Sequence, residues 1–459
     1  MIGGVPMKGR SLIWFVSLIC VSLLFSSCAP AQSSSQASQN TTSSASPATS
    51  GTTKSDASDP SQPAAVDLMA NIQAAKWSDA TDKPDPFVLK SFNRFSVALL
   101  QESIKQKKTG NVMISPVSVF LALAMTLNGA DGETRDAMLN VLADDGITVD
   151  MVNAASRAWI SRLTKTGEKT ALSIANSIWF RDGFQPYQPF LQANADFYRA
   201  SARQLDFADQ ASADIINDWV DQETHGLIEK IIEKISPTTV MFLINTIYFK
   251  SDWQTPFEKA ETRKKTFNSP SGPVDAEFMH RIAPMSYFSG DGVVGVMLPY
   301  DNGQFAYFAM LPEDSVTPRE WLAAQDKAAL FEKISRLMAQ KANFTVQLML
   351  PKYEAEYEDS LVDDLSTLGM DIAFGGAADF SRLNAQRAKG LYISEVKHKT
   401  FIKVDEKGTE AAAATSVAID ESLPASDIQL TFDQPFIYGI MDWETGTPLF
   451  VGILENPAA

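Results

Sequence analysis

The chain has 459 residues, 45% of them hydrophobic, and a formal net charge of −16. A chain of this length and composition can bury one large core or two moderate ones, which excludes disorder over most of its length. The acidic balance would repel a phosphate backbone, and the longest basic run is only Arg263-Lys264-Lys265. A nucleic-acid partner is therefore not expected.

The first 28 residues have the pattern of a signal peptide. Lys8 and Arg10 precede an apolar run, residues 12–25, that is too short to remain as a membrane anchor. The next residues, Ser26-Ser27-Cys28, resemble the lipobox of bacterial lipoproteins, in which Cys28 is lipidated and becomes the new N-terminus. We expect an exported, membrane-anchored lipoprotein that faces the periplasm or the extracellular side. Ordinary cleavage near residues 29–31 is the alternative.

Residues 29–80 are predicted to form a flexible tether. The stretch 32–63 is rich in Ser, Thr, Ala and Gln and holds almost no large apolar side chain, so it cannot offset the entropy lost on ordering. We place the folded domain at residues 81–459, with its first ordered residue between Val66 and Phe87. The one other cysteine, Cys20, would be removed with the signal peptide, so the mature domain would have no disulfide.

Apolar periodicity and end signals indicate several helices. Phe92, Phe95 and Leu99 recur at helical spacing. Ser115-Pro116 begins a second helix that ends near Asn128-Gly129 and is apolar nearly all round, so it should be buried. Two more helices are predicted at residues 212–224 and 360–368, each followed closely by a glycine.

Strands dominate the second half of the chain. Two hairpins, with strands at 293–300 and 305–311 and at 435–443 and 448–454, have glycine-containing turns and are apolar on both faces. Residues 241–249 and 344–350 are further predicted buried strands. The sequence shows no internal repeat, so we predict one mixed α+β domain.

The sequence carries no complete motif for a catalytic, cofactor or metal site. Residues 290–295 match a dinucleotide-binding glycine fingerprint, but a strand follows instead of the helix that binds pyrophosphate, so we predict a hairpin turn. The three histidines, His225, His280 and His398, are scattered in the sequence. We expect no enzyme activity, no cofactor and no metal. A Ser-His-Asp site assembled from distant residues is the open alternative.

The stretch 404–424 has two competing interpretations. Read with a period of two, it has one increasingly apolar face, which is typical of a strand with one buried side. That face consists of Thr409, Ala411, Ala413, Thr415, Val417 and Ile419. The run of alanines instead favours a short surface helix capped by Thr409. Local signals do not decide between the two.

Several motifs, taken in order, resemble those of the serpins, a family of serine protease inhibitors. They are Asn111–Val119, Asn245–Trp253, Leu350–Tyr353, Ala378–Ser381, Val396–Lys399, the hinge Asp405–Thr415, Pro435-Phe436 and Pro448–Gly452. The resemblance covers roughly residues 86–457. Two residues depart from the family pattern, because Ser251 stands where a Gly is usual and Gln434 where a His or Arg is common.

The resemblance implies a fold of three β-sheets and eight to nine helices with an exposed reactive loop at residues 404–424. In serpins a protease cleaves this loop, which then inserts into the central sheet as an extra strand. The implied function is irreversible inhibition of an elastase-like or subtilisin-like serine protease, which becomes the covalent partner of a monomeric inhibitor. The alternatives are a non-inhibitory serpin-fold binding protein, a plain protease substrate and a cross-class inhibitor of cysteine proteases.

The resemblance also assigns the functional residues. The reactive bond would be Ser422-Leu423, with Glu421-Ser422 as the next candidate. The hinge residues would be Glu406, Gly408, Thr409, Glu410, Ala411, Ala412, Ala413, Ala414 and Thr415. The point at which the central sheet opens, called the shutter, would consist of Ser115, Ser118, Asn245 and His398. The point at which insertion begins, called the breach, would consist of Trp253, Lys352 and Glu406.

Overall fold

The computed structural model describes residues 65–77, 83–236, 238–313, 315–339, 343–409 and 426–458, which all belong to one unit of the chain, residues 58–459. The predicted α+β class is confirmed, with nine α-helices among these residues. The helices are α1 (Pro86–Gln106), α2 (Pro116–Leu127), α3 (Gly132–Leu142), α4 (Val149–Leu163), α5 (Gln188–Tyr198), α6 (Ala211–Glu223), α7 (Pro318–Ala323), α8 (Leu330–Met338) and α9 (Val362–Leu365).

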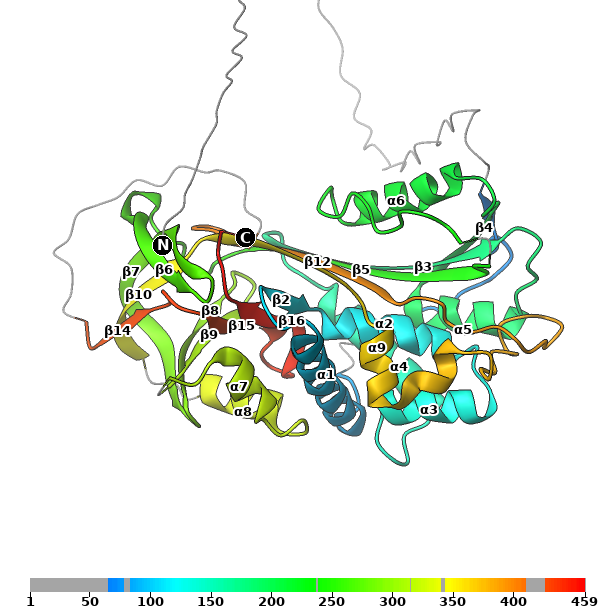
Figure 1. The fold of residues 1–459 in the computed structure, drawn as a ribbon, viewed down its shortest axis with the longest axis horizontal. Helices are drawn as coiled ribbons and strands as arrows, with labels where there is room; N and C mark the ends of the chain where they lie inside the picture. The colour runs from blue at the N-terminus through cyan, green and yellow to red at the C-terminus, as the bar shows by residue number, and fades with distance from the viewer. Residues whose placement is uncertain are drawn as a thin grey trace, which may run out of the picture. The chain divides into compact units, whose positions relative to one another are not determined.

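The central sheet has seven strands, and all neighbours are antiparallel except β3 and β4. In spatial order they are β1 (Val66–Asp67), β4 (Ser201–Leu205), β3 (Thr170–Arg181), β5 (Met241–Asp252), β13 (Gly408–Thr409), β12 (Lys397–Val404) and β11 (Tyr353–Ser360). The long strands β3, β5 and β12 lie side by side in Figure 1. Because β13 is only two residues long, most of the edge of β5 that faces β12 has no strand partner among the described residues.

The remaining strands form one continuous nine-stranded sheet. Its order is β14 (Ile428–Thr431), β10 (Asn343–Pro351), β7 (Gly272–Gly290), β8 (Val293–Pro299), β9 (Phe305–Pro312), β15 (Phe436–Asp442), β16 (Thr447–Leu454) and β2 (Val112–Ile114), with β6 (Arg263–Ser269) paired to β7. The 19-residue β7 joins two parts of this sheet, because it pairs with β6 and β10 up to Ser286 and with β8 from Ser286 onward.

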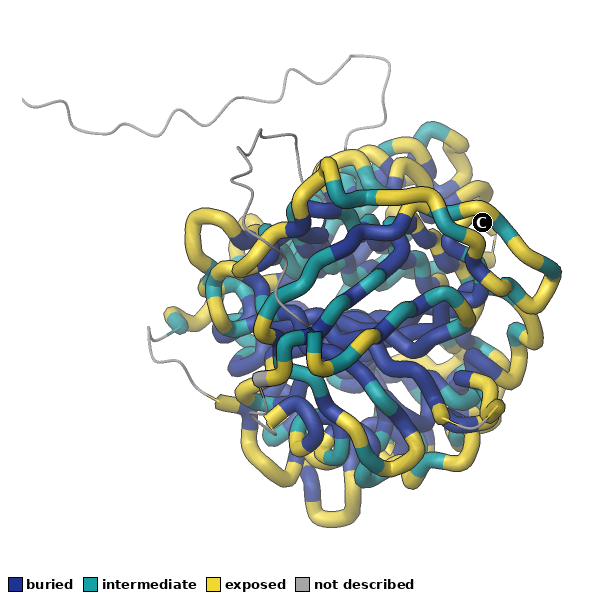
Figure 2. Tube along the Cα trace, turned by 90° about the vertical axis from the view of Figure 1, so that its left-hand side faces the viewer, coloured by how far each residue is buried: buried dark blue, intermediate teal, exposed yellow. Residues whose placement is uncertain are grey.

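Helices cover both faces of the central sheet. Figure 1 shows α6 on one side of β3 and β5, and α2 and α5 on the other. The apolar helix predicted from Pro116 is α2, and all but one of its residues are buried. Figure 2 shows that the buried segments run through the middle of the fold while the exposed ones form its rim. Among the described residues, no helix is both long and apolar enough to cross a membrane.

The hairpins and the glycine fingerprint agree with their predictions. Strands β8 and β9 form one predicted hairpin, and β15 and β16 form the other, with every residue of β9, β15 and β16 buried. The fingerprint is the turn between β7 and β8, where Asp291 and Gly292 have φ angles of 57° and 76°. The helix predicted at 360–368 is shorter than expected, because α9 ends at Leu365 and the chain continues in a wider turn through Gly369, whose φ is 115°.

Part of the predicted tether belongs to the fold. Residues 65–77 lie before the predicted boundary at residue 80, but β1 pairs with β4, and the Trp77 indole donates to the carbonyl of Asp196 at 2.6 Å. The strand begins at Val66, where the range predicted for the first ordered residue also begins. The Arg199 guanidinium lies 3.9 Å from the centre of the Trp77 ring. Unlike residues 32–63, this segment carries large apolar side chains that pack on the core. These are Leu68, Met69, Ile72 and Trp77.

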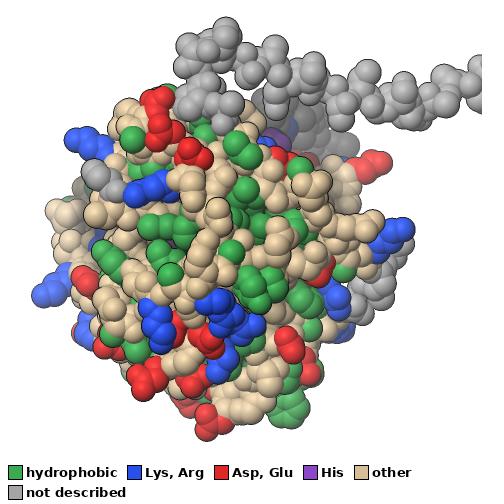
Figure 3. Space-filling model, turned by 90° about the vertical axis from the view of Figure 1, so that its right-hand side faces the viewer, with side chains coloured by type: hydrophobic (Ala, Val, Ile, Leu, Met, Phe, Trp, Pro, Cys, Tyr) green, Lys and Arg blue, Asp and Glu red, His purple; other side chains and the backbone are tan. Residues whose placement is uncertain are grey.

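The surface mixes charges of both signs. The face drawn in Figure 3 carries Lys and Arg side chains interspersed with Asp and Glu, and hydrophobic side chains lie between them. Several of the chain's cations are paired, as in Lys389–Asp379 at 2.6 Å and Arg387–Asp131 at 2.9 Å. No broad field of one sign covers this face, so its charges do not mark a binding site for a polyanion.

Candidate functional site

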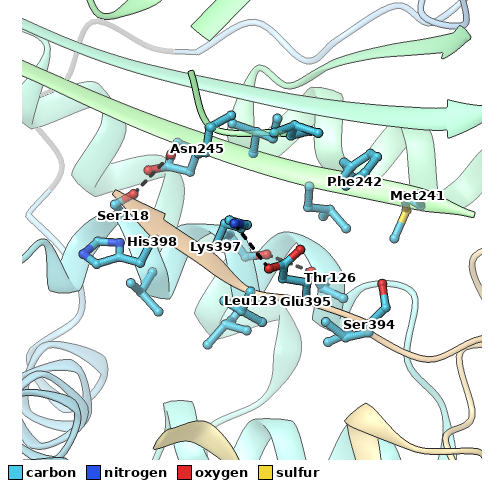
Figure 4. Close-up of a pocket in the computed structure, with 18 of the residues that line it drawn as sticks. Ser118, Leu123, Thr126, Met241, Phe242, Asn245, Ser394, Glu395, Lys397 and His398 are labelled. Atoms are coloured by element: carbon cyan, nitrogen blue, oxygen red, sulfur yellow. Dashed lines mark hydrogen bonds and ion pairs between the residues drawn. The ribbon is translucent and has the colours of Figure 1, made fainter. Parts of the chain in front are cut away.

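A groove lies between β5 and β12 in the central sheet. It encloses about 1590 Å³, including its open mouth. Figure 4 shows Met241, Phe242 and Asn245 of β5 on one side and Lys397 and His398 of β12 on the other. The floor includes residues of α2, and the segment 228–232 after α6 closes part of the far wall. The groove has the position and direction of a missing strand.

The hinge lies in line with this groove, between the same two strands. Gly408 pairs with Asp252, and Thr409 pairs with Ser251 on β5 and with Val404 on β12. A Cβ atom on Gly408 would lie 2.0 Å from the carbonyl oxygen of Ser251, so only glycine allows this close approach. The Thr409 side chain points to the core, where its hydroxyl and that of Tyr300 are 2.6 Å apart.

The breach residues are close together beside the hinge. The Lys352 ammonium is 3.2 Å from the Glu406 carboxylate, which also accepts from the Thr262 hydroxyl at 2.7 Å. Burial opposes ionisation of Glu406, but the hydrogen bonds from Thr262 and Lys352 outweigh it, so the pKa of Glu406 is below its usual value. The Trp253 indole donates to the carbonyl of Asp405 at 2.9 Å. This cluster holds the turn between β12 and β13 in place.

The shutter residues line the middle of the groove. The backbone N–H of Ser115 donates to Nε2 of His398 at 3.1 Å, and the Ser118 hydroxyl donates to the carbonyl of Asn245 at 3.4 Å. Burial lowers the pKa of His398 to about 4, and the charge of Asp359 opposes that shift only in part. The hydroxyl of Ser115 and Oδ1 of Asn245 are buried and have no hydrogen-bond partner among the described residues. Unpaired buried polar atoms of this kind are costly, and an added strand could satisfy them.

Some predicted site residues lie outside the described part of the chain. These are the hinge residues Glu410 to Thr415, the reactive bond Ser422-Leu423 and the lipidation site Cys28. The choice between strand and helix for residues 404–424 therefore concerns mostly residues outside the described part of the chain. Gly408 and Thr409 are described, and they form a strand.

Three residues of the site were missed in the sequence. The side chain of Tyr300 is hydrogen-bonded to Thr409, and that of Thr262 to Glu406. Asn176 accepts a hydrogen bond from the side-chain amide of Asn245 at 2.7 Å. No local motif marks them, because each partner is distant in the sequence. Ser115 was found by its position before a helix, but its side chain caps nothing and its N–H binds His398 instead.

The gap between β5 and β12, here called the slot, has β13 paired at one end of it among the described residues. The family model described as Serpin (serine protease inhibitor) matches residues 90–457. The chain belongs to the serpin family.

Relatives and solved structures agree with this assignment. An uncharacterized serpin-like protein of Thermococcus kodakarensis is 31% identical over 85% of this chain and 91% of its own length. Human serpin B9 is 30% identical over 79% of this chain and 97% of its own length. The family also includes human thyroxine-binding globulin, crystallised with its hormone, at 25% identity and a TM-score of 0.72 over 83% of this chain and all of that one.

The thermophilic serpin tengpin allows a comparison of two states of one protein. Its native state matches with a TM-score of 0.77 and 36% identity over 85% of this chain and 99% of tengpin. Its latent state matches with a TM-score of 0.69 and 34% identity over 83% of this chain and 99% of that one. The described residues are thus more similar to the native form.

Proposed function

We propose that this protein is a suicide-substrate inhibitor of serine proteases that traps the acyl-enzyme by inserting its cleaved reactive loop into the central sheet. One observation carries the proposal: Gly408 and Thr409 already pair between β5 and β12, and farther along these two strands the described residues leave a groove. A strand nucleated at one end of a prepared slot can grow along it by adding hydrogen bonds on both sides.

The pairing at the hinge predicts the register of the inserted strand. Thr409 pairs with Ser251 and Val404, and each step forward in the loop is one step back in β5 and in β12. Thr415 would therefore lie between Asn245 and His398, on the same face as Thr409. Its hydroxyl would meet the shutter, where Oδ1 of Asn245 is unpaired among the described residues.

Insertion would release a large free energy. In this register Ile419 reaches the level of Met241, where β5 begins, so about ten residues gain strand pairing. At roughly 1 kcal/mol net per hydrogen bond, this amounts to on the order of 10 kcal/mol before packing is counted. That rivals the entire stability of an ordinary domain, so the uncleaved form would be metastable and kept by kinetics.

The chemistry belongs to the protease. Its serine attacks the carbonyl carbon of Ser422, the bond to the nitrogen of Leu423 breaks, and the protease is left as an ester of Ser422. Thr409 to Ser422 extends about 45 Å at roughly 3.3 Å per residue, so insertion carries the ester-linked protease far from its starting position. A displaced oxyanion hole no longer stabilises the water attack that would free it. The inhibitor supplies no catalytic group and is used once.

The test is a mixture with an elastase-like or subtilisin-like serine protease, analysed on a denaturing gel. The proposal predicts a covalent band at the summed mass of protease and inhibitor fragment. The released C-terminal peptide, identified by mass spectrometry, should begin at Leu423. Complete cleavage without any covalent band, at several protease ratios, would contradict inhibition and indicate a substrate.

We further propose that the chain is exported and anchored through lipid on Cys28, and that it acts as a monomer. The support is the sequence pattern of the first 28 residues. Metabolic labelling with radioactive palmitate should label the protein, and Cys28→Ala should abolish both the label and recovery in the membrane fraction. Unchanged labelling of the variant would contradict the anchor.

A further inference from the structure

A smaller cavity lies beside the hinge, separate from the slot. It encloses about 580 Å³ and is partly closed off from solvent. Three segments form its walls: residues 253–257 after β5, residues 281–286 of β7 and residues 297–299 at the end of β8. None of the sites described above includes this cavity. Trp253 is the one breach residue that also lines it.

The notable group in this cavity is Arg281. Its guanidinium donates to the carbonyl of Thr255 and lies 4.6 Å from the centre of the Phe257 ring. Its Nε is buried without a hydrogen-bond partner, and no carboxylate of a described residue forms an ion pair with it. Burial alone lowers the pKa of Arg281 to about 10, which leaves the side chain charged at neutral pH.

Arg162 shows how this chain treats an arginine that is buried. Its guanidinium forms ion pairs with the carboxylates of Asp442 at 2.6 Å and Glu444 at 2.8 Å. Arg281 is only partly buried, but its Nε is shielded from solvent and has no acceptor, so its hydrogen bonding is incomplete among the described residues. A charge-assisted pair with a planar carboxylate is the interaction that a guanidinium forms best.

We propose that this cavity binds a small organic carboxylate, with its anionic group on Arg281. The walls suit a ligand of that class. Gln254 and Ser286 add polar side chains, while Phe257, Met285 and Met297 add apolar surface for a short hydrocarbon or aromatic body.

Occupancy of this site would act on the hinge. The N–H of Phe257 donates to the carbonyl of Glu406 at 2.7 Å, and the N–H of Trp253 donates to the carbonyl of Lys407 at 2.6 Å. The wall of the cavity therefore holds the turn that must yield when the loop inserts. A bound carboxylate would stiffen that wall and slow insertion of the loop. This effect on insertion rests on the proposed inhibitory function, whereas binding of the carboxylate does not depend on it.

Binding is tested by titration calorimetry with benzoate and with benzamide, which has the same shape but no charge, at constant ionic strength set by sodium chloride. Acetate and succinate extend the series. We expect saturable binding of at least one of the carboxylates, and benzoate at least about tenfold tighter than benzamide, because only the anion pairs with Arg281. Equal affinity for benzoate and benzamide, or no binding of any of the three carboxylates, would overturn the proposal.

Two variants separate the site from general charge effects. Arg281→Gln should abolish carboxylate binding, whereas Arg336→Gln, which removes an exposed arginine, should leave it intact. Should Arg281→Gln fail to fold, Ser286→Leu fills the cavity from another wall and should also abolish binding. Unchanged binding in either cavity variant would place the carboxylate elsewhere and overturn the proposal.

Regulation has a separate readout. Saturating carboxylate should reduce the rate of covalent complex formation with protease at least about threefold in the native protein and not in Arg281→Gln. If no covalent complex forms under any condition, the proposed inhibitory function is contradicted. The calorimetric experiment still tests carboxylate binding independently. If complex forms at the same rate with and without ligand, the regulatory part is contradicted.

Discussion

At the scale of single residues, the hinge glycine carries the tightest steric constraint. Gly408 has no room for a Cβ because the Ser251 carbonyl would be 2.0 Å away. We expect Gly408→Ala to push β13 off β5 and to slow trapping of a protease by roughly tenfold, which corresponds to about 1.4 kcal/mol in the barrier to insertion. The measurement is the rate of covalent complex formation. Gly376→Ala, at a glycine with open space around its Cα, is the control and should trap at the native rate.

The buried histidine of the shutter predicts a pH effect. The pKa of His398 is about 4 in the folded protein and about 6.5 when unfolded, so the unfolded state binds the proton more tightly. Its contribution to stability is therefore complete above pH 6.5 and is lost as the pH falls from 6.5 to 4. The loss reaches about 3 kcal/mol at most by linkage.

A second buried group acts with the opposite sign. Burial raises the pKa of Asp364 to about 6, so this carboxyl stabilises the fold as the pH falls from 6 to 3.8. The native protein alone cannot separate the two effects. The free energy of unfolding of native protein minus that of His398→Gln should fall steadily between pH 6.5 and 4.5. Parallel curves for the two proteins over that range would contradict a buried neutral His398.

Residue types at the site were predictable only in part. The resemblance pointed to Ser118, Asn245 and His398, and the structure brings them to one groove. Tyr300 and Thr262 gave no signal, because a tyrosine or threonine beside the end of a strand is ordinary and their partners are 109 and 144 residues away in the sequence. Contacts between distant segments depend on the whole sheet, and local pattern does not encode them.

At the scale of elements, the inserted strand should show the alternation of a one-sided β-strand. In the predicted register Ala413 faces the core, whereas Glu410 lies level with Lys250 and Lys403 on the opposite face, where the Lys403 side chain is exposed. Ala413→Arg should block insertion and convert the protein into a substrate, because burying an unpaired charge costs several kcal/mol. Glu410→Arg, which puts the same side chain on the opposite face, is the matched control and should still trap protease. The ratio of covalent complex to cleaved product on a denaturing gel is the measurement, and reversed phenotypes would contradict the register.

The short strand β1 and the residues after it form an unexpected edge of the central sheet. Trp77→Ala removes a hydrogen bond to Asp196 and the contact with Arg199, so we expect a loss of about 2 kcal/mol in the free energy of unfolding. Denaturant unfolding measures it. Lys76→Ala, at the exposed neighbour, should change it by less than about 0.5 kcal/mol. Equal stability of Trp77→Ala and the native protein would show that the segment does not hold the sheet.

Elements with strong local signals were predicted well, including the pairing within the two hairpins, whereas the order of the other strands was not predicted. The apolar run of α2 and the turns of the two late hairpins identify themselves through helix ends and glycines. The slot between β5 and β12 has no local signature, because strand order is decided by packing across the molecule. The start of the folded part was predicted only as a range, between Val66 and Phe87, for a related reason: a few apolar residues in a polar stretch suffice to dock it against the edge of a sheet.

At the scale of the whole molecule, the described residues leave a gap in the central sheet between β5 and β12. Buried polar atoms without partners among those residues line it, such as the Ser115 hydroxyl and Oδ1 of Asn245. An inserted strand would extend β13 and offer hydrogen-bond partners to those atoms. Under the proposed mechanism the uncleaved protein is therefore less stable than the cleaved one, the reverse of what backbone cleavage does to most proteins.

The most direct measurement is the melting temperature before and after a single cut in the reactive loop, with an elastase-like protease used in catalytic amount and then inactivated. Release of on the order of 10 kcal/mol in a domain of this size predicts a rise of roughly 10–20 °C. Hydrogen exchange of residues 410–419 should slow at the same time. A cut protein that melts at or below the temperature of the intact one would contradict loop insertion and the inhibitory mechanism built on it.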